Sequence, residues 1–377
     1  MRENILGGIN KNIVFRKPLG HMEKKLFLQP KRKEVLKYHF EGDSLFRTII
    51  YFRSDVGCEH GMKTGGCVGC GHWRSGTAGK KLNISNMYIQ QYFNAIRDGG
   101  INPIMCLYNE GSMLNPGEVP FDQLIFIVQH LANHGVKKLI LECRPNHVKE
   151  DVLSPLKRAA KEMKVEIGMG LESSNDFVRN HLFLKSTTLQ SYEKATSILH
   201  QYNFDSLAYV LIKPPFLNES QAINDAINTI EYAFEIGFDA VCLEPFSVAP
   251  HTVTEILYEH GSYKPPWLWS VIKVIKATFQ KGQIRIGGFQ FEPLPAILPE
   301  NCTRCNDKVL LSFSEYNRTF DLTHLNSLNC DCYQDFLEEV NGLEKTIENE
   351  KLYEDILRFS ERFHSLAKTW DDNTFRV

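Results

Sequence analysis

The sequence contains no apolar run that approaches the roughly 20 residues a helix needs to cross a bilayer, and its first residues lack the apolar core of a signal peptide. Its 377 residues carry a net charge of only −2, so no overall basic field indicates a nucleic-acid partner. It also lacks low-complexity segments and repeats of short fixed period. These absences predict a cytoplasmic globular protein that contacts no membrane.

Disulfide pairs are not expected, because a reducing compartment keeps thiols free. The chain nevertheless contains 10 cysteines. Cys106, Cys143 and Cys242 stand singly inside apolar runs, which is typical of small buried hydrophobic residues. The other cysteines fall into two tight clusters, and each cluster is a candidate metal site.

The chain alternates apolar, strand-like runs with longer amphipathic segments. The candidate strands are residues 47–57, 102–109, 137–144, 165–173, 206–213 and 240–247. Residues 121–135 and 222–237 have helical spacing, and Gly237 ends the second segment as a C-terminal helix glycine does. Repeated strand–helix units with apolar strands predict an α/β fold, a parallel sheet coiled into a TIM-like partial (β/α)6 barrel.

We expect three regions along the chain. Residues 1–45 form a locally basic N-terminal extension, and residues 46–280 form the barrel. After residue 280 a stretch rich in glycine and proline leads to the second cysteine cluster. The tail from Asp335 to about Leu366 is acidic and helix-prone. Residues 281–377 are therefore predicted to form a small cysteine-rich C-terminal subdomain with a covering helix.

Polar side chains stand at nearly every predicted strand exit. These residues are Cys58, Asn109 with Glu110, Glu142, Glu172, Lys213 and Glu244. In barrels of this kind the active residues sit at the carboxyl ends of the strands. The pattern predicts one shared site at the barrel mouth. The alternative is that polar residues simply begin the loops.

The first cysteine cluster has the spacing C-x8-C-x2-C and consists of Cys58, Cys67 and Cys70. Three thiolates suit an iron–sulfur cluster in which one iron keeps an open position. The alternative is a zinc knuckle with His60 or His72 as the fourth ligand. The position directly after a barrel strand, beside a ring of polar residues, favours the open cluster.

At this loop the sequence resembles the radical SAM superfamily, although the first gap is longer than the usual C-x3-C-x2-C. Within the elongator-like branch it is most similar to the archaeosine biosynthesis radical SAM proteins (RaSEA), which modify tRNA. The phrases that carry the resemblance run in order from about residue 47 to 335: GGCVGCGHW, NEGSMLNPGEVP, LECRPNHV, GLESSNDFVR, LIKPPFLNESQAINDA, YKPPWLWSVIKVI and PENCTRCNDKV.

The resemblance implies a radical SAM barrel with a 4Fe-4S cluster on Cys58, Cys67 and Cys70. The open iron would bind S-adenosylmethionine, whose reductive cleavage yields a 5′-deoxyadenosyl radical. It further implies positions for the cofactor at His72 (adenine), at Asn109, Glu110, Gly111 and Ser112 (methionine amino group), and at Glu142, Arg144 and Glu172 (ribose and sulfonium). Lys213 and Glu244 are candidate catalytic residues toward the substrate. The structural alternatives are an ion pair between Glu142 and Arg144, a helix cap at Glu172 and a surface role for Lys213.

The second cysteine cluster, Cys302, Cys305, Cys330 and Cys332, has the spacing C-x2-C-x24-C-x-C. Four thiolates in two pairs favour a structural zinc ion, and a second iron–sulfur cluster is the rival interpretation.

The resemblance implies an enzyme of the oxidoreductase or lyase type that converts a lysine-bearing deazaguanine base in tRNA to archaeosine. Because the net charge is near neutral, a partner protein is expected to supply RNA affinity, and an electron donor such as a flavodoxin or ferredoxin is implied. The aromatic segment with Trp267 and Trp269 would either stack on a nucleobase or pack in the core. The alternatives are a radical SAM enzyme for a small metabolite or peptide and a zinc-stabilised binding module without catalysis.

Overall fold

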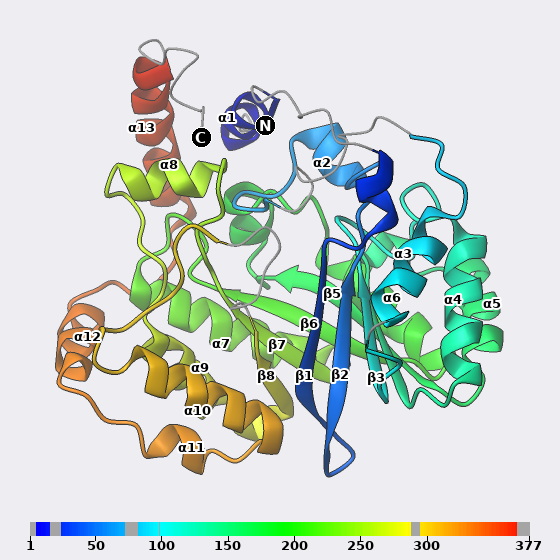
Figure 1. Ribbon diagram of the computed structural model, residues 1–377. Helices are drawn as coiled ribbons and strands as arrows, with labels where there is room; N and C mark the ends of the chain where they lie inside the picture. Colours follow the sequence, from blue (N-terminus) through cyan, green and yellow to red (C-terminus); the bar gives the residue numbers. More distant parts are fainter. Residues whose placement is uncertain (1–4, 16–23, 72–81, 98, 288–294, 368–377) are drawn as a thin grey trace.

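The computed structural model describes residues 5–15, 24–71, 82–97, 99–287 and 295–367. Its centre is one eight-stranded sheet in the order β1 to β8 (Figure 1). The strands are β1 (Arg32–Phe40), β2 (Asp43–Tyr51), β3 (Ile104–Tyr108), β4 (Lys138–Glu142), β5 (Lys164–Glu172), β6 (Asp205–Ile212), β7 (Ala240–Pro245) and β8 (Gln283–Ile286). Strands β1 and β2 are antiparallel, and all other pairs are parallel. The carboxyl ends of β2 to β8 therefore meet at one edge of the sheet.

The predicted partial barrel is confirmed, and the six predicted strands correspond to β2 through β7. The sheet is larger than the predicted barrel of residues 46–280, because β1 and β8 extend it at its two ends. Strand β1 joins through the turn at Glu41 and Gly42, whose φ angles of 52° and 87° are typical of a tight hairpin turn. This short turn is the local signal that the sequence contained for β1.

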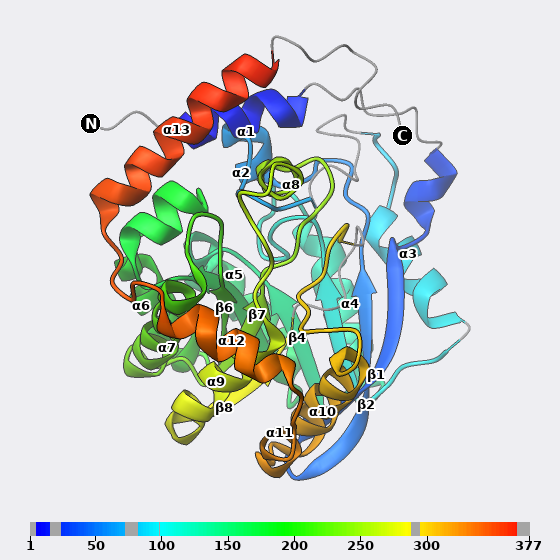
Figure 2. The ribbon, with the colours of Figure 1, turned by 90° about the vertical axis from the view of Figure 1, so that its left-hand side faces the viewer.

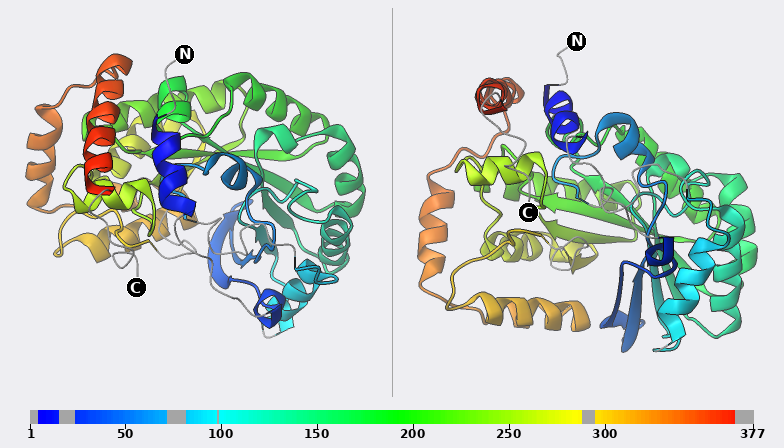
Figure 3. Two further views of the ribbon diagram at one scale, coloured as in Figure 1. Left: turned by 90° about the horizontal axis from the view of Figure 1, so that it is seen from above. Right: turned by 45° about the horizontal axis from the view of Figure 1, so that its top comes forward.

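The helices that follow the strands cover the convex face of the sheet (Figure 3). They are α3 (Met87–Arg97), α4 (Phe121–Asn133), α5 (Glu150–Ala160), α6 (Leu189–Gln201), α7 (Glu219–Glu235) and α9 (Leu268–Thr278). Helices α4 and α7 confirm the two predicted amphipathic segments. Helix α7 begins with a capping box, in which the Asn218 side chain accepts the Gln221 N–H and Gln221 returns the interaction. The main core lies between these helices and the sheet, with side chains such as Leu107, Leu141 and Ile167 fully buried.

The concave face of the sheet carries the alternate residues of the same strands. Cys106, Tyr108 and Ile140 belong to one small apolar cluster on it, and Cys242 belongs to another. Buried charges accompany them. Lys138 and Arg285 both pair with Glu166, at 2.7 Å for the lysine and at 2.6 and 2.9 Å for the two guanidinium nitrogens. Although burial opposes it, these two cations lower the pKa of Glu166 to about 2.

Helix α10 (Asn306–Thr319) covers the seam between the two edge strands, β8 and β1 (Figure 2). The Asn317 side chain accepts the Ile286 N–H at 2.8 Å and donates to the Ile286 carbonyl at 2.7 Å. On the other side, a His39 ring nitrogen of β1 hydrogen-bonds the Arg318 carbonyl at 3.1 Å. Helix α10 of the C-terminal region therefore covers the open edge of the barrel and hydrogen-bonds backbone groups of β8 there.

The rest of the C-terminal region forms α11 (Thr323–Asn326), α12 (Cys332–Asn341) and α13 (Asn349–Ala367). Helices α12 and α13 occupy most of the predicted helix-prone tail from Asp335 to about Leu366, and the cap residue Gly342 follows the end of α12 at Asn341. Helix α13 packs on α1 (Ile5–Phe15), and both lie with α8 (Val253–Glu259) at the same end of the barrel as α2 (Glu59–Thr64) in Figures 1 and 2. Short segments complete the fold: η1 (Lys24–Leu28), η3 (Pro145–His147), the π-helical η4 (Val178–Leu182) and η5 (Phe279–Lys281).

No helix in the described part of the chain has the length and apolar character needed to cross a membrane.

Candidate functional site

The loop after β2 carries the first cysteine cluster. Cys58 is the N-terminal cap of α2, and its sulfur accepts the Gly61 N–H at 3.4 Å. Cys67 and Cys70 share a tight turn, in which the Cys70 N–H reaches the Cys67 carbonyl at 3.2 Å. The three predicted ligands therefore lie on one loop at the carboxyl end of the sheet.

Residues distant in the sequence hold this loop. The Asn10 side chain on α1 donates to the carbonyls of Gly65 and Gly66, at 2.8 and 3.0 Å. The Val68 N–H, between the second and third cysteines, donates to the Phe183 carbonyl at 3.0 Å. The N-terminal helix and the segment after β5 thus fix the loop conformation, and no local pattern predicted either contact.

His60 is not free to act as a fourth ligand. Its Nε2 hydrogen-bonds the Leu184 carbonyl at 2.9 Å, and its Nδ1 hydrogen-bonds Thr64 Oγ1 at 3.3 Å. Burial lowers its pKa to about 4. The zinc-knuckle alternative therefore depends on His72, which lies outside the described residues.

The C-terminal set of four cysteines has ligand atoms that all lie within 4.8 Å of one another. Thiolates that share one ion must approach this closely, whereas each thiolate of a cubane binds a different iron. The C-terminal set therefore has the spacing expected for a single ion, and the described part of the chain contains no second group of this kind.

Glu118 joins the cysteine loop to the loop after β3, and sequence reasoning gave it no role. Its buried carboxylate accepts the N–H of Glu59, next to Cys58, at 2.9 Å and the N–H of Ser112 at 2.5 Å. A Cβ on Gly111 would lie 2.0 Å from Glu118 Oε2, so a larger residue there would displace the carboxylate. The signal was present, because Glu118 lies inside the quoted phrase NEGSMLNPGEVP.

The predicted segment Asn109–Ser112 directly follows β3. Asn109 Nδ2 is buried and makes no hydrogen bond of good geometry in the described chain, although the Asn109 side chain lies near enough to the Glu118 carboxylate to favour its charged form. Glu110 forms a buried ion pair with Lys31 at 2.5 Å, and the Ser112 hydroxyl accepts the Arg144 N–H at 3.1 Å. An orphaned buried donor is costly, and a bound ligand with an acceptor group would satisfy it.

Three predicted carboxyl groups stand at the ends of β4, β5 and β7. Burial raises the pKa of Glu142 and of Glu244 to about 7, and Glu172 is close enough to contribute to both shifts. Glu172 has a φ of 64° and pairs with Lys185 at 2.5 Å. The alternative ion pair between Glu142 and Arg144 does not form among the described residues, because the Arg144 side chain donates to the Lys185 carbonyl at 2.6 Å.

Glycines make room for these side chains on the concave face. A Cβ on Gly170 would lie 2.2 Å from Glu172 Oε1, and one on Gly287 would lie 2.2 Å from Glu244 Oε1. A Cβ on Gly168 would lie 2.6 Å from the ring of Tyr209, whose hydroxyl hydrogen-bonds Glu142. The backbone is therefore shaped around the carboxyl groups.

Lys213 follows β6, as predicted, but its charge already has a partner. Its ammonium pairs with Glu219 at 2.5 Å, and both side chains are buried. Glu219 also accepts the Trp267 N–H at 3.0 Å and the Ser270 hydroxyl. A contact of Lys213 with the substrate stays a prediction.

Sequence comparison finds named relatives of this chain. The chain is 29% identical over 292 residues to archaeosine synthase subunit beta from Methanosarcina acetivorans, covering 76% of this chain and 83% of that protein. It is 28% identical over 234 residues to archaeosine synthase subunit beta from Thermococcus kodakarensis, covering 60% and 70%. The chain resembles archaeosine synthase subunit beta. The resemblance predicted from the sequence is thus confirmed, while no family model matches the chain.

Two solved structures show partial similarity. Elp3 from Methanocaldococcus infernus aligns with a TM-score of 0.45 at 14% identity, covering 64% of this chain and 60% of that one. Methylornithine synthase (PylB) aligns with a TM-score of 0.42 at 12% identity, covering 66% and 68%. The chain thus spans less than two thirds of the Elp3 chain.

The second cysteine cluster is brought together as predicted. The sulfur of Cys302 lies 3.6 Å from those of Cys305 and Cys330, and the sulfurs of Cys305 and Cys332 are also 3.6 Å apart. Zinc–sulfur bonds of about 2.3 Å in a tetrahedron place the sulfurs about 3.8 Å apart. The set therefore fits one tetrahedral ion, and it is too compact for a cubane.

The two tryptophans of the aromatic segment belong to this region. Trp269 is buried and donates its indole N–H to the Cys332 sulfur at 3.3 Å. The Trp267 indole donates to Glu339 at 2.9 Å, and its ring contacts Phe336. Core packing is thus confirmed for Trp269. Its indole N–H also orients the sulfur of Cys332, one of the four candidate metal ligands.

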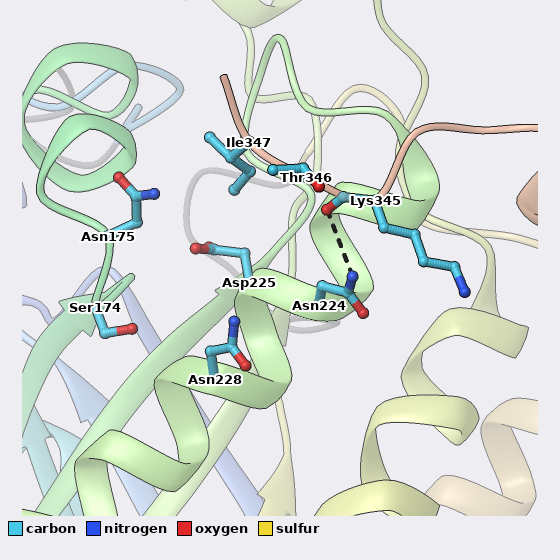
Figure 4. A pocket seen from close by; sticks show the side chains of 8 residues that line it. All are labelled: Ser174, Asn175, Asn224, Asp225, Asn228, Lys345, Thr346 and Ile347. Atoms are coloured by element: carbon cyan, nitrogen blue, oxygen red, sulfur yellow. Dashed lines mark hydrogen bonds between the residues drawn. The ribbon is translucent and has the colours of Figure 1, made fainter. Parts of the chain in front are cut away.

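A polar pocket of about 410 Å³ lies outside the predicted site, between the loop after β5, helix α7 and residues 345–347 (Figure 4). The Asp225 carboxyl faces it. One oxygen accepts the Ser173 hydroxyl at 2.7 Å, and the other is buried with no partner in the described chain. Burial raises the pKa of Asp225 to about 7. Residue 345 closes the far side, where the Asn224 amide donates to the Lys345 carbonyl at 3.4 Å.

Proposed function

We propose that this chain is a radical SAM enzyme that holds a 4Fe-4S cluster on Cys58, Cys67 and Cys70. The observation that carries the proposal is the geometry of the cysteine loop. Three thiols lie on one loop at the carboxyl end of a parallel sheet, and both ring nitrogens of the adjacent His60 already hydrogen-bond Leu184 and Thr64. This arrangement leaves one position of the cluster without a ligand from the described chain.

When bound, the reduced cluster supplies the electron that cleaves S-adenosylmethionine to methionine and a 5′-deoxyadenosyl radical, which removes a hydrogen atom from the substrate. The protein's residues bind and orient the cofactor. The orphaned Asn109 Nδ2 suits the cofactor carboxylate, and the carboxyl groups of Glu142 and Glu172 suit its ribose hydroxyls and its sulfonium charge. Glu118 holds the cysteine loop and the Asn109–Ser112 loop in register with each other.

The proposed substrate is a lysine-bearing deazaguanine base in tRNA, which would lose its lysine carbon chain through carbon–nitrogen cleavage to give archaeosine. The support is the similarity to two proteins named archaeosine synthase subunit beta. Because the net charge of −2 provides no general RNA affinity, a partner protein is expected to bring the tRNA. A flavodoxin- or ferredoxin-type protein would supply the electron.

The C-terminal cysteines are proposed to bind one structural zinc ion. The 3.6 Å separations of their sulfurs support zinc over a second iron–sulfur cluster. Cys305 directly precedes α10, the helix that covers the barrel seam. The ion would therefore hold this helix against β8 and β1.

Anaerobic purification and assay test the proposal. We expect about four irons and four sulfides in the cubane plus one zinc per chain, and 5′-deoxyadenosine on reduction with S-adenosylmethionine. A tRNA whose lysine side chain is deuterated should transfer deuterium into the 5′-deoxyadenosine. Zinc alone without acid-labile sulfide would instead support the binding-module alternative. If the enzyme cleaves S-adenosylmethionine but shows neither deuterium transfer nor salt-sensitive tRNA binding, the result would support a small metabolite or peptide as the substrate.

A further inference from the structure

Arg47 of β2 is a charged residue on the concave face of the sheet, and it has no counter-ion among the described residues. Its guanidinium makes no hydrogen bond and no ion pair there, and its Nε is buried without a partner. The guanidinium carbon lies 5.0 Å from the centroid of the Tyr38 ring. Arg285 lies at the same distance from this ring, but Glu166 pairs with it at 2.6 and 2.9 Å. The structure thus neutralises one arginine and leaves its neighbour unpaired.

Glu244 at the end of β7 is a carboxyl group that, like Arg47, has no partner of opposite charge among the described residues. Its carboxyl forms no ion pair in the described chain, and its one side-chain hydrogen bond is with the Cys242 thiol. Arg47 is close enough to favour its charged form, although burial raises the pKa of Glu244 to about 7. Two groups of opposite charge therefore lie near enough to interact but form no ion pair with each other among the described residues.

Unpaired charges of this kind are costly, because buried ionic groups are normally paired. Both residues are partly exposed, although the Arg47 Nε atom itself is buried. A ligand that carries an anionic and a cationic group would satisfy both at once. A guanidinium binds a carboxylate through two parallel hydrogen bonds, and a carboxylate binds an ammonium group. The free end of an amino acid has both groups on one carbon.

We propose that Arg47 and Glu244 bind the amino-acid end of the substrate, with Arg47 on the carboxylate and Glu244 on the ammonium group. This inference rests on the proposed function, in which the modified base carries a lysine. Arg47 is attached four residues before the end of β2, below the carboxyl edge at which Glu142 and Glu172 stand. The amino-acid end would thus lie deeper in the barrel than the base, and the lysine carbon chain would pass the radical site.

The test compares two tRNA probes. One carries the lysine-bearing base, and the other carries the same base with 1,5-diaminopentane, which keeps the terminal ammonium group but lacks the carboxylate. Dissociation constants are measured by filter binding with unreduced enzyme, and 5′-deoxyadenosine formation is measured after reduction. The wild type should prefer the lysine probe by about 10- to 100-fold, the range expected for a charge-assisted pair.

Arg47→Gln should abolish this preference, and Arg47→Lys should restore part of it. Glu244→Gln should weaken both probes about equally, by about 10-fold, because both carry the ammonium group. Arg318→Gln is the matched control, since Arg318 pairs with Glu315 on the surface of α10, and it should behave like the wild type.

An unchanged preference for the lysine probe in Arg47→Gln, or in Arg47→Met should the first variant not fold, overturns the subsite. A wild type that makes no 5′-deoxyadenosine with either probe overturns the proposed function instead. The two failures are distinguishable, because the first leaves wild-type turnover intact.

Discussion

The carboxylate of Glu118 accepts the backbone N–H of Glu59 at 2.9 Å. This contact connects the residue after Cys58 to the loop after β3, because the same carboxylate also holds the Ser112 N–H. The cysteine loop and the segment proposed to hold the methionine group of S-adenosylmethionine are therefore oriented by one buried side chain. Distortion of either loop should affect the other.

Glu118→Gln tests this connection. Glutamine keeps one acceptor oxygen but lacks the negative charge, and each hydrogen bond to a charged group contributes about 1.5–3 kcal/mol. We expect a KM for S-adenosylmethionine raised about 10-fold and a lower iron content, with zinc unchanged. Metal analysis and steady-state kinetics measure both. The exposed Glu162→Gln variant should match the wild type, and an unaltered KM and iron content in Glu118→Gln would show that the link is not needed.

The two cysteine clusters should respond differently to the loss of one ligand. Cys67→Ala should abolish cofactor cleavage and leave one zinc per chain, because the barrel core does not depend on that loop. Cys305→Ala should lose the zinc and lower the melting temperature by several degrees, since it releases α10 from the barrel seam. Metal analysis, calorimetry and 5′-deoxyadenosine assays separate the two. Continued 5′-deoxyadenosine formation by Cys67→Ala contradicts the cluster assignment.

The ion-pair triad at the other end of the barrel should be important for stability. Glu166→Gln would leave Lys138 and Arg285 as buried charges without their shared partner. Breaking a buried pair in this way costs about 3–5 kcal/mol. Chemical unfolding should show this loss, whereas Glu315→Gln, which breaks a surface pair, should change the free energy of unfolding by less than about 1 kcal/mol. Equal effects of the two substitutions would contradict the assigned burial.

Asp225 should make stability depend on pH. Burial raises its pKa from 3.8 to about 7, so the folded chain binds an additional proton between these values. Its contribution is complete below about pH 4 and is lost as the pH rises through about 7. Asp225→Asn keeps the acceptor for Ser173 and removes this titration. As the pH rises from 4 to 8, the free energy of unfolding of this variant should increase by about 2–4 kcal/mol relative to that of the wild type. A pH-independent difference in melting temperature would contradict the raised pKa.

Much of the fold followed from local periodicity. Strands β2 to β7 appeared as apolar runs, and helix α7 appeared with its terminal Gly237, because burial on a sheet or a helix face imposes a short repeat on the residue types. The cysteine clusters were also readable, since metal ligands must be close together and short spacings reveal them. The same reasoning indicated the helix-prone tail from Asp335 to about Leu366, although it did not locate the boundary between α12 and α13.

The positions at which distant segments meet were not readable from the sequence. Asn10 holds Gly65 and Gly66, Glu118 joins two loops, and Asn317 satisfies the edge of β8, each across many residues of chain.

The sequence by itself indicated strands β2 to β7, helices α4 and α7 and the two cysteine clusters, because these depend on neighbours along the chain. Only the tertiary structure decided which charges are paired. Within the described chain Arg285 received Glu166, whereas Arg47 and Glu244 have no counter-ion, because pairing depends on which side chains the curled sheet brings into contact.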